Sequence, residues 1–243
     1  MPRTAALVCA AALMAAACWF AVRPDMARSK SLCTAGMAFV PGGTHVYGSS
    51  PMLLKHILTQ CNRSLGSCYQ EWFDGELQGY RKITTGPVCV DRFEYPNEPG
   101  VMPQISTDWV QAQRMCEARG KRLCTDVEWE LACAGDAGSQ WPYGNKHTQG
   151  LCNFNSKDLE PSGSRDTCVS QYGAYDMSGN ASEWTLSSLA QITLPPGETL
   201  TPRVVKGGNF RDNPLFTRCA FREAYETDVS YDYFGFRCCS AVN

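Results

Sequence analysis

Apolar and polar residues alternate along GMAFVPGGTHVYGSS, residues 36–50, around a Pro-Gly-Gly turn. This period of two predicts a β-hairpin. In PMLLKHILTQC, residues 51–61, the leucines and the isoleucine recur at helical spacing, which predicts a short amphipathic helix. The mostly apolar run VCVDRFEYP, residues 88–96, predicts a strand that ends at its proline. The first part of the chain is therefore expected to contain both strands and a helix.

Two further helices are predicted next to each other. The first runs through WVQAQRMCEAR, follows the N-cap candidates in the tripeptide STD, and stops at Gly120. The second runs through DVEWELAC and ends near Gly135. Thr125 and Glu128 have the spacing of a capping box, in which each side chain bonds the backbone of the other residue.

The rest of the chain predicts long ordered loops with a few short strands. Gly, Asn, Ser, Asp and Pro dominate residues 134–180, and the segments RVVKGGNF, RCAFREA and FGFRCC predict strands near the C-terminus. No internal repeat and no linker interrupt residues 31–243. We therefore expect one α+β domain over 31–243, with two main helices, short strands and many loops.

Residues 1–30 have the pattern of an export segment. Arg3 precedes the apolar run ALVCAAALMAAACWFAV, and three alanines precede Cys18. Three alternatives stay open: a cleaved signal peptide, a bacterial lipoprotein lipidated at Cys18, and an uncleaved membrane anchor. Each places the rest of the chain outside the cytoplasm, as a periplasmic protein, as a lipoprotein attached to the membrane, or as a secreted protein.

Charge and cysteine content argue against some classes of function and in favour of disulfides. The net charge of −2 is spread without a basic stripe, so nucleic acid is not an expected partner. Of fourteen cysteines, Cys9 and Cys18 lie in the export segment, and the twelve that remain are an even number in an exported chain, which predicts disulfides. A zinc site is not indicated, because no CxxC pair occurs and the three histidines lack ligand spacing.

The stretch YDMSGNASEWT, residues 175–185, is a candidate metal loop. Asp176 and Glu183 are seven residues apart, and Gly179 between them permits a backbone conformation that lets the chain curl. A curled loop with two carboxylates and inward carbonyls offers the all-oxygen shell that suits Ca²⁺. The alternative is a polar turn capped by its own Asp and Asn side chains.

Several motifs in order resemble one family. DMSGNASEWT resembles the GN-x-x-EW signature of the formylglycine-generating enzymes, also called sulfatase-modifying factors. GMAFVPGGTHVYGS resembles the opening hairpin of this family, DWVQAQRMCEARGKRLCTDVEWELAC its helix pair, and KGGNF, CAFRE and GFRC its closing strands. The resemblance covers residues 36–238, with 50–88 as a family-divergent insertion. It implies a formylglycine-generating-enzyme-like variant of the C-type lectin fold, rich in loops, with structural calcium and disulfides.

The resemblance also implies specific residues. The calcium loop would use side-chain oxygens of Asp176 and Glu183 with the carbonyls of Gly179 and Ala181. The following residues would begin a second calcium site: Asn153 and Phe154. Two implied disulfides join the helices to the last strands: Cys116–Cys238 and Cys133–Cys219. Proximity in sequence suggests two more, Cys61–Cys68 and Cys152–Cys168, and the remaining cysteines would then form Cys89–Cys124 and Cys33–Cys239.

The enzyme of this family oxidises a sulfatase cysteine to formylglycine with O₂ and with copper held by two cysteines. The corresponding stretch here, GGNFRDNPLFTRCAFR, has no cysteine before Cys219, and Asp212 stands where the first catalytic cysteine would be. Cu(I) prefers thiolate ligands, so we expect no copper site, no formylglycine synthesis and no catalytic residue. Arg211, Asp212 and Arg222 would line a remnant cleft, or Arg211 and Asp212 would form a surface ion pair.

Two functions remain after this comparison. The leading expectation is a noncatalytic binding or scaffold protein of the cell envelope, whose groove holds a peptide, a glycan or a partner protein. Residues 50–88 would supply the partner-specific surface, since variable function often lies on loops. The alternative is an oxygen-dependent oxidoreductase of the same superfamily with a non-cysteine active site.

Overall fold

The computed structural model of the protein describes residues 32–189, 192–194 and 198–243. The predicted export segment, residues 1–30 with Cys18, lies outside the described residues. Within the described ranges, no helix is both long and apolar enough to cross a membrane.

The two central helices begin where their capping residues predict. Helix α5, Trp109–Glu117, starts at Asp108, whose side chain accepts a hydrogen bond from the third helical residue. Helix α6, Asp126–Ala134, starts at the predicted capping box of Thr125 and Glu128. Each box satisfies backbone N–H groups that the first turn of a helix leaves free. Both predicted helices are confirmed.

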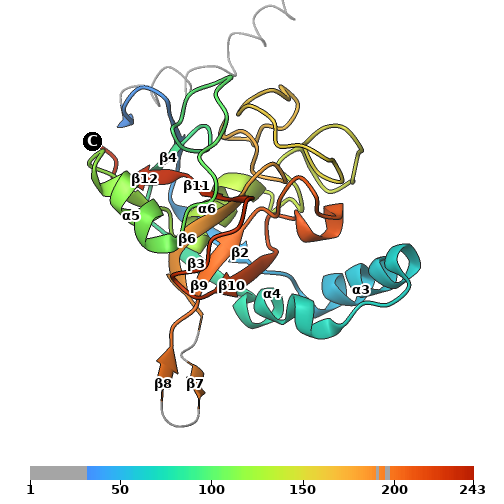
Figure 1. Ribbon diagram of the computed structural model, residues 1–243. Coiled ribbons are helices and arrows are strands. Elements are labelled where there is room, and N and C mark those ends of the chain that lie inside the picture. The colour runs from blue at the N-terminus through green and yellow to red at the C-terminus, as the bar shows by residue number, and fades with distance from the viewer. Residues whose placement is uncertain (1–31, 190–191, 195–197) are drawn as a thin grey trace, which may run out of the picture.

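Two four-stranded sheets form the centre of the fold (Figure 1). The first has the strand order β1-β4-β12-β5 and is antiparallel. Its strands are β1 Met37–Val40, β4 Val88–Asp91, β12 Cys238–Ser240 and β5 Arg122–Leu123. The second has the order β10-β9-β6-β11, and only the β6–β11 pair is parallel. Its strands are β10 Arg222–Tyr225, β9 Arg203–Lys206, β6 Ser182–Ser188 and β11 Phe234–Phe236. A separate hairpin pairs β7, Ile192–Leu194, with β8, Glu198–Leu200.

The prediction of a hairpin over residues 36–50 is wrong, because the two strands in this segment do not pair with each other. Strand β1 pairs with β4, and β2, Gly43–Tyr47, pairs with β3, Arg81–Thr85. Three of the four β1 residues are buried, whereas β2 is mostly exposed, so the two strands belong to different layers. Gly42 marks the break, since a side chain there would lie 2.5 Å from the carbonyl oxygen of Thr85.

Within the divergent insertion 50–88, residues 51–79 form an additional helical layer between β2 and β3, and the insertion also contains β3 itself. Helix α3, Pro51–Leu65, is longer than the predicted one and starts at Ser50, whose side chain accepts from a backbone N–H. The 3₁₀ turn η1, Gln70–Phe73, and helix α4, Asp74–Gly79, follow it. The expectation of two main helices is therefore incomplete. Figure 1 shows α3 and α4 to one side of the second sheet, near β10.

This layer packs on the segment that leads into β10. The cluster contains these buried side chains: Leu54, Ile57, Cys61, Phe73, Leu215 and Phe221. Segment 214–216 forms a second 3₁₀ turn, η2, before β10. The insertion and the segment before β10 therefore share one apolar core, and the space above β10 becomes enclosed on one side.

The twelve cysteines of residues 32–243 form six disulfides. They are Cys33–Cys89, Cys61–Cys68, Cys116–Cys238, Cys124–Cys239, Cys133–Cys219 and Cys152–Cys168. The two pairs that the resemblance implies and the two suggested by proximity are all present. The expected pairs Cys89–Cys124 and Cys33–Cys239 are wrong. Strand β12 pairs with β5, which places Cys239 opposite Arg122 and beside Cys124.

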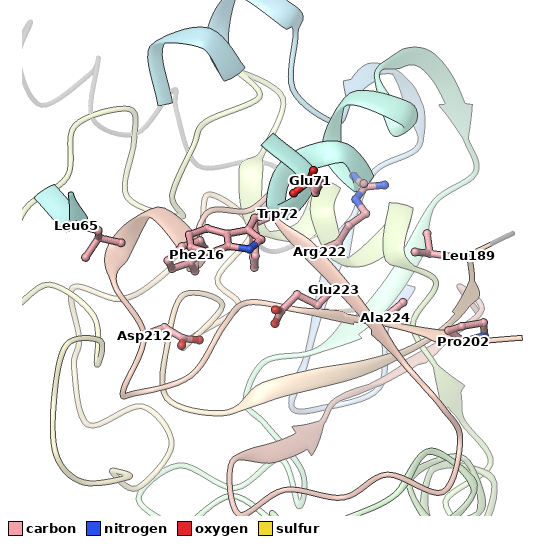
Figure 2. A pocket seen from close by; sticks show the side chains of 12 residues that line it. Leu65, Glu71, Trp72, Leu189, Pro202, Asp212, Phe216, Arg222, Glu223 and Ala224 are labelled. Atoms are coloured by element: carbon pink, nitrogen blue, oxygen red, sulfur yellow. The ribbon is translucent and has the colours of Figure 1, made fainter. Parts of the chain in front are cut away.

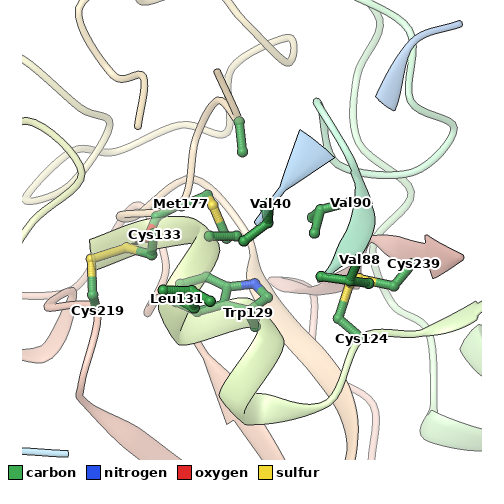
Figure 3. Close-up of a cluster of buried hydrophobic side chains, with 12 residues drawn as sticks. Val40, Val88, Val90, Cys124, Trp129, Leu131, Cys133, Met177, Cys219 and Cys239 are labelled. Carbon is green, nitrogen blue, oxygen red and sulfur yellow. Dashed lines mark hydrogen bonds between the residues drawn. A yellow bond between two sulfur atoms is a disulfide. The ribbon is translucent and has the colours of Figure 1, made fainter. Parts of the chain in front are cut away.

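The largest core cluster lies around Trp129 of α6. Figure 3 shows the Cys124–Cys239 and Cys133–Cys219 disulfides in this cluster, together with valines of the first sheet. The indole N–H of the buried Trp129 donates to Glu183 at 2.6 Å. The core therefore contacts the predicted calcium loop directly.

Candidate functional site

The loop of residues 175–185 curls as its glycine predicts. Asp176, Gly179 and Asn180 all have positive φ, of 56°, 80° and 58°. A side chain on Gly179 would lie 2.1 Å from the carbonyl oxygen of Asn153, which leaves no room for another residue. The loop therefore packs tightly against the segment that contains the second predicted calcium position.

Glu183, at the end of this loop, is fully buried and forms an ion pair with Arg237. Arg237 donates to its two carboxylate oxygens at 2.6 and 2.7 Å. The Trp129 indole donates to one of the same oxygens. A carboxylate offers about four acceptor positions, so one position, on Oε1, remains for a further donor or a metal.

The negative charge of Asp176 is compensated by fewer hydrogen-bond donors than that of Glu183. The side chain is buried, and the backbone N–H of Gly163 donates to it at 2.6 Å. Burial raises the pKa of Asp176 to about 6, and the charge of Glu183 adds to this effect, while the Gly163 N–H and Arg237 oppose it.

A third carboxylate, Glu94, was not expected at this site. It is fully buried and accepts hydrogen bonds from the Asn180 side chain and the Ala181 backbone at 2.9–3.1 Å. Burial, followed by the negative charges of Asp176 and Glu183, raises the pKa of Glu94 well above its ordinary value. In the sequence, the only sign that Glu94 belongs to a site was its position as an acid inside the apolar segment FEYP.

Glu94 and the two loop acids, Asp176 and Glu183, thus lie near one guanidinium, that of Arg237. Within residues 32–189, 192–194 and 198–243, no three Asp, Glu, His or Cys side chains converge on a single metal position. A calcium ion here would therefore depend on backbone carbonyls as well. The Asp176 carboxylate, the free position on Glu183 and the Gly179 and Ala181 carbonyls are all oxygen donors, which fits Ca²⁺.

The residues expected to begin a second calcium site fit a metal poorly. The guanidinium of Arg165 donates to the Asn153 side-chain oxygen at 3.3 Å and to the Cys152 carbonyl at 2.8 Å. It also forms two hydrogen bonds to Glu160, at 2.6 and 2.7 Å. The side chain of Arg165 therefore already supplies a positive charge beside Asn153.

A cavity of about 570 Å³ lies between the helical insertion and β10 (Figure 2). Three acids and three aromatic residues line it, together with smaller apolar groups: Glu71, Trp72, Asp212, Phe216, Phe221 and Glu223. Glu71 and Trp72 come from η1, in the insertion, and Glu223 from β10. Trp72 is 42% exposed, so the cavity is open to solvent on that side.

Asp212 lines this cavity and does not pair with its neighbour. Arg211 instead forms an exposed ion pair with Asp232 at 2.8 Å, so the expected Arg211–Asp212 surface pair is wrong. One Asp212 oxygen, Oδ2, accepts from both the backbone and the side chain of Asn209, each at 2.8 Å. Burial raises the pKa of Asp212, although the Asn209 hydrogen bonds partly offset this effect.

Glu223 faces Asp212 in the cavity (Figure 2). Burial by the surrounding walls raises the pKa of Glu223, and the nearby charge of Asp212 raises it further. Arg222 does not neutralise these acids, because its guanidinium is bonded to Glu130 at 2.9 Å and to the Tyr47 hydroxyl. The cleft that the sequence predicted therefore exists with Asp212, but Arg222 has its charged group directed away from it.

The twelve cysteines of residues 32–243 are all in disulfides, so none of them offers a free thiol to this cavity. Asp212 occupies the position that the resemblance assigns to the first catalytic cysteine. The cavity therefore offers carboxylates, aromatic rings and apolar groups to a ligand.

Comparisons with known proteins agree with the sequence motifs. A family described as "Sulfatase-modifying factor enzyme 1-like domain" matches residues 23–242. The formylglycine-generating enzyme of Bos taurus is 32% identical over 162 residues, which cover 56% of this chain and 43% of that protein. The inactive C-alpha-formylglycine-generating enzyme 2 of Mus musculus is 30% identical over 159 residues, covering 58% and 50%. This chain spans between a quarter and a half of the length of the first curated relatives.

The fold has solved counterparts as well. PvdO from Pseudomonas aeruginosa superposes with a TM-score of 0.61 at 16% identity, covering 84% of this chain and 94% of that one. At such low identity the likeness concerns the fold alone. It confirms the expected α+β variant of the C-type lectin fold.

Proposed function

This chain belongs to the sulfatase-modifying factor family, and on that premise we propose that it is a ligand-binding domain that does not form formylglycine. The observation that carries the proposal is the cavity above β10. It contains Asp212 where the enzymes of the family would need a thiol, and the described cysteines are all consumed by disulfides. A Cu(I) site without thiolates lacks its preferred soft ligands.

The shape of the cavity supports binding. Its volume of about 570 Å³ lies in the range of small-molecule and side-chain pockets. The insertion 50–88 forms one wall and is fixed to the core through its own apolar cluster. We infer that this insertion determines which peptide, glycan or partner protein the domain accepts.

Structural calcium is part of the proposal. The ion would bind at the loop of Asp176, Gly179, Ala181 and Glu183, where three acids share one guanidinium. Its positive charge would offset the repulsion among these buried carboxylates. We assign no second ion to Asn153 and Phe154, because Arg165 already provides a cation there.

We further propose that the domain works outside the cytoplasm, in the periplasm or on the cell envelope. Six disulfides are typical of an oxidising compartment. The apolar segment before residue 30 would direct export and could attach the protein to a membrane through lipidated Cys18 or as an anchor. We expect its partner to be another envelope component.

One observation favours a second candidate function. Asp212 and Glu223 face each other, and the pKa of each is raised. A carboxylate with a raised pKa can accept a proton from a bound substrate near neutral pH. An oxygen-dependent oxidoreductase with a non-cysteine site is therefore the alternative to a binding protein.

The test combines an activity assay with O₂ measurement. The protein is incubated with Cu(I) or Fe(II), a reductant and a cysteine peptide of the sulfatase type, and the peptide is analysed by mass spectrometry. The proposal predicts no aldehyde product and no O₂ consumption above that of Asp212→Asn. Aldehyde formation would show a formylglycine synthase, and O₂ consumption that is lost in Asp212→Asn would favour the alternative oxidoreductase.

A further inference from the structure

The cavity above β10 combines an aromatic wall with unpaired acids. Trp72 and Phe216 lie with ring centroids 5.8 Å apart, and Phe216 and Phe221 with centroids 5.3 Å apart, both edge-to-face. Such a wall offers π faces and edges from both the insertion and the segment before β10. Aromatic faces attract cations, most strongly when the cation is shielded from water.

The acids of the cavity have no cationic partner among the described residues. Glu71, Asp212 and Glu223 all line the space, and the ion pairs of the described chain do not include any of them. Asp212 keeps one oxygen, Oδ1, clear of its hydrogen bonds to Asn209. The raised pKa values of Asp212 and Glu223 are consistent with this lack of compensation.

Arg222 also lines the cavity and does not change this balance. The Arg222 guanidinium bonds Glu130 and Tyr47 on the inner side of β10, so its aliphatic stem is the part that faces the cavity. Gly75 of α4 packs directly on this stem, since a side chain added at Gly75 would lie 2.9 Å from Cγ of Arg222. The stem and the rings form an apolar floor between the acids.

We propose that the cavity binds an organic cation, an ammonium or guanidinium group on an alkyl stem. This inference rests on the proposed binding function and specifies its ligand class. The carboxylates would accept charge-assisted hydrogen bonds from the cation, and the rings of Trp72 and Phe216 would pack on its stem. A lysine or arginine side chain of a partner protein and a free alkyl amine share this chemistry.

The experiment measures binding of three small probes to the oxidised, calcium-loaded protein by titration calorimetry. The probes are acetyl-Gly-Arg-Gly-amide, the same tripeptide with uncharged citrulline in place of arginine, and agmatine. Citrulline has nearly the shape of arginine without its charge, so it isolates the contribution of the cation. We expect the arginine tripeptide to bind at least about tenfold more tightly than the citrulline tripeptide.

Variants locate the binding in the cavity. Asp212→Asn and Glu223→Gln should each weaken the arginine tripeptide about tenfold, because each removes a charged acceptor. Glu98→Gln, an exposed acid outside the cavity, should leave the affinity unchanged. Thermal unfolding of each variant shows whether a lost affinity reflects lost folding, and Asp212→Asn keeps the acceptor for Asn209.

The possible outcomes test the cationic ligand and the proposed binding function separately. Binding of agmatine as tight as that of the arginine tripeptide would assign a free amine, whereas binding of the tripeptide alone would assign a protein segment; both support the inference. Equal affinity for the citrulline tripeptide would overturn the cation and leave a binding domain. Binding of no probe, or affinities that the two cavity variants do not change, would also overturn the inference. Peptide oxidation by the wild type would instead contradict the proposed function itself.

Discussion

Glu76 of α4 and Arg218, which lies just before β10, form a buried bidentate pair with hydrogen bonds of 2.5 and 2.8 Å. They are 142 residues apart in sequence, and neither side chain is more than 1% exposed. This pair fixes the helical insertion to the wall that carries Asp212 and Glu223. The insertion wall of the cavity is therefore joined to the opposite wall by a buried ion pair as well as by apolar packing.

Replacing Glu76 with Gln should destabilise the protein strongly. The change leaves the Arg218 guanidinium buried without its counter-charge, which costs about 3–5 kcal/mol in comparable cases. Urea unfolding measures this loss. The matched control is Asp232→Asn, which breaks the exposed pair with Arg211 and should leave the urea midpoint almost unchanged. Equal losses for the two variants would mean that the buried pair does not anchor the insertion.

Calcium should stabilise the protein through Asp176. At a calcium concentration of 100 times the Kd, a single site adds about 2.7 kcal/mol to the free energy of unfolding. Removal of calcium with a chelator should lower the Tm of the wild type, and Asp176→Asn should abolish most of the difference. Asp166→Asn, at an exposed acid, is the control and should retain it. A chelator effect that persists in Asp176→Asn would place the ion elsewhere.

Arg165 should act as a built-in cation beside Asn153. Substitution Arg165→Gln removes the charged contacts to Glu160 and to the Cys152 carbonyl, so we expect a lower Tm with and without calcium. The calcium stoichiometry should stay at about one per chain, as the donor set of the single loop predicts. A wild-type stoichiometry of two would show that a second ion competes successfully with this guanidinium.

Affinity for a cationic ligand should depend on pH through the cavity acids. The cation binds the ionised carboxylates, and the pKa values of Asp212 and Glu223 are raised. Affinity should therefore be full only above these raised pKa values, and as pH drops it should fall before the pH reaches the ordinary range of Asp and Glu, about 4. Calorimetry of the arginine tripeptide across pH measures the fall. Asp212→Asn should have a weaker pH dependence, and an unchanged profile would contradict the role of Asp212.

Local signals in the sequence were sufficient for some parts of this fold. The capping box of Thr125 and Glu128 fixes the start of α6, because both partners are within one turn of each other. Gly179 similarly marks the curl of the loop at residues 175–185, where its φ is positive. No local signal indicates the Cys116–Cys238 and Cys133–Cys219 pairs, which join residues far apart and were implied by the family resemblance alone.

Long-range pairing could not be predicted in the same way. The partner of Cys239 depends on β12 lying next to β5, and the partners of β1 and β2 depend on strands beyond Gly79. Glu94 reaches the loop at residues 175–185 only through tertiary packing, since Asn180 is 86 residues away. The cavity likewise requires the insertion to fold back on the segment before β10, and the helical periodicity of residues 51–61 predicts an apolar face without indicating its partner.

The most direct test of the central claim is a metal analysis with a map of free thiols, on protein produced through an oxidising secretory route. Mass spectrometry after alkylation identifies each cysteine between Cys33 and Cys239. We predict about one calcium per chain, no copper, and no alkylated cysteine among the twelve that form disulfides. Stoichiometric copper together with two alkylated cysteines would contradict a binding domain and would indicate thiol-based oxidation chemistry.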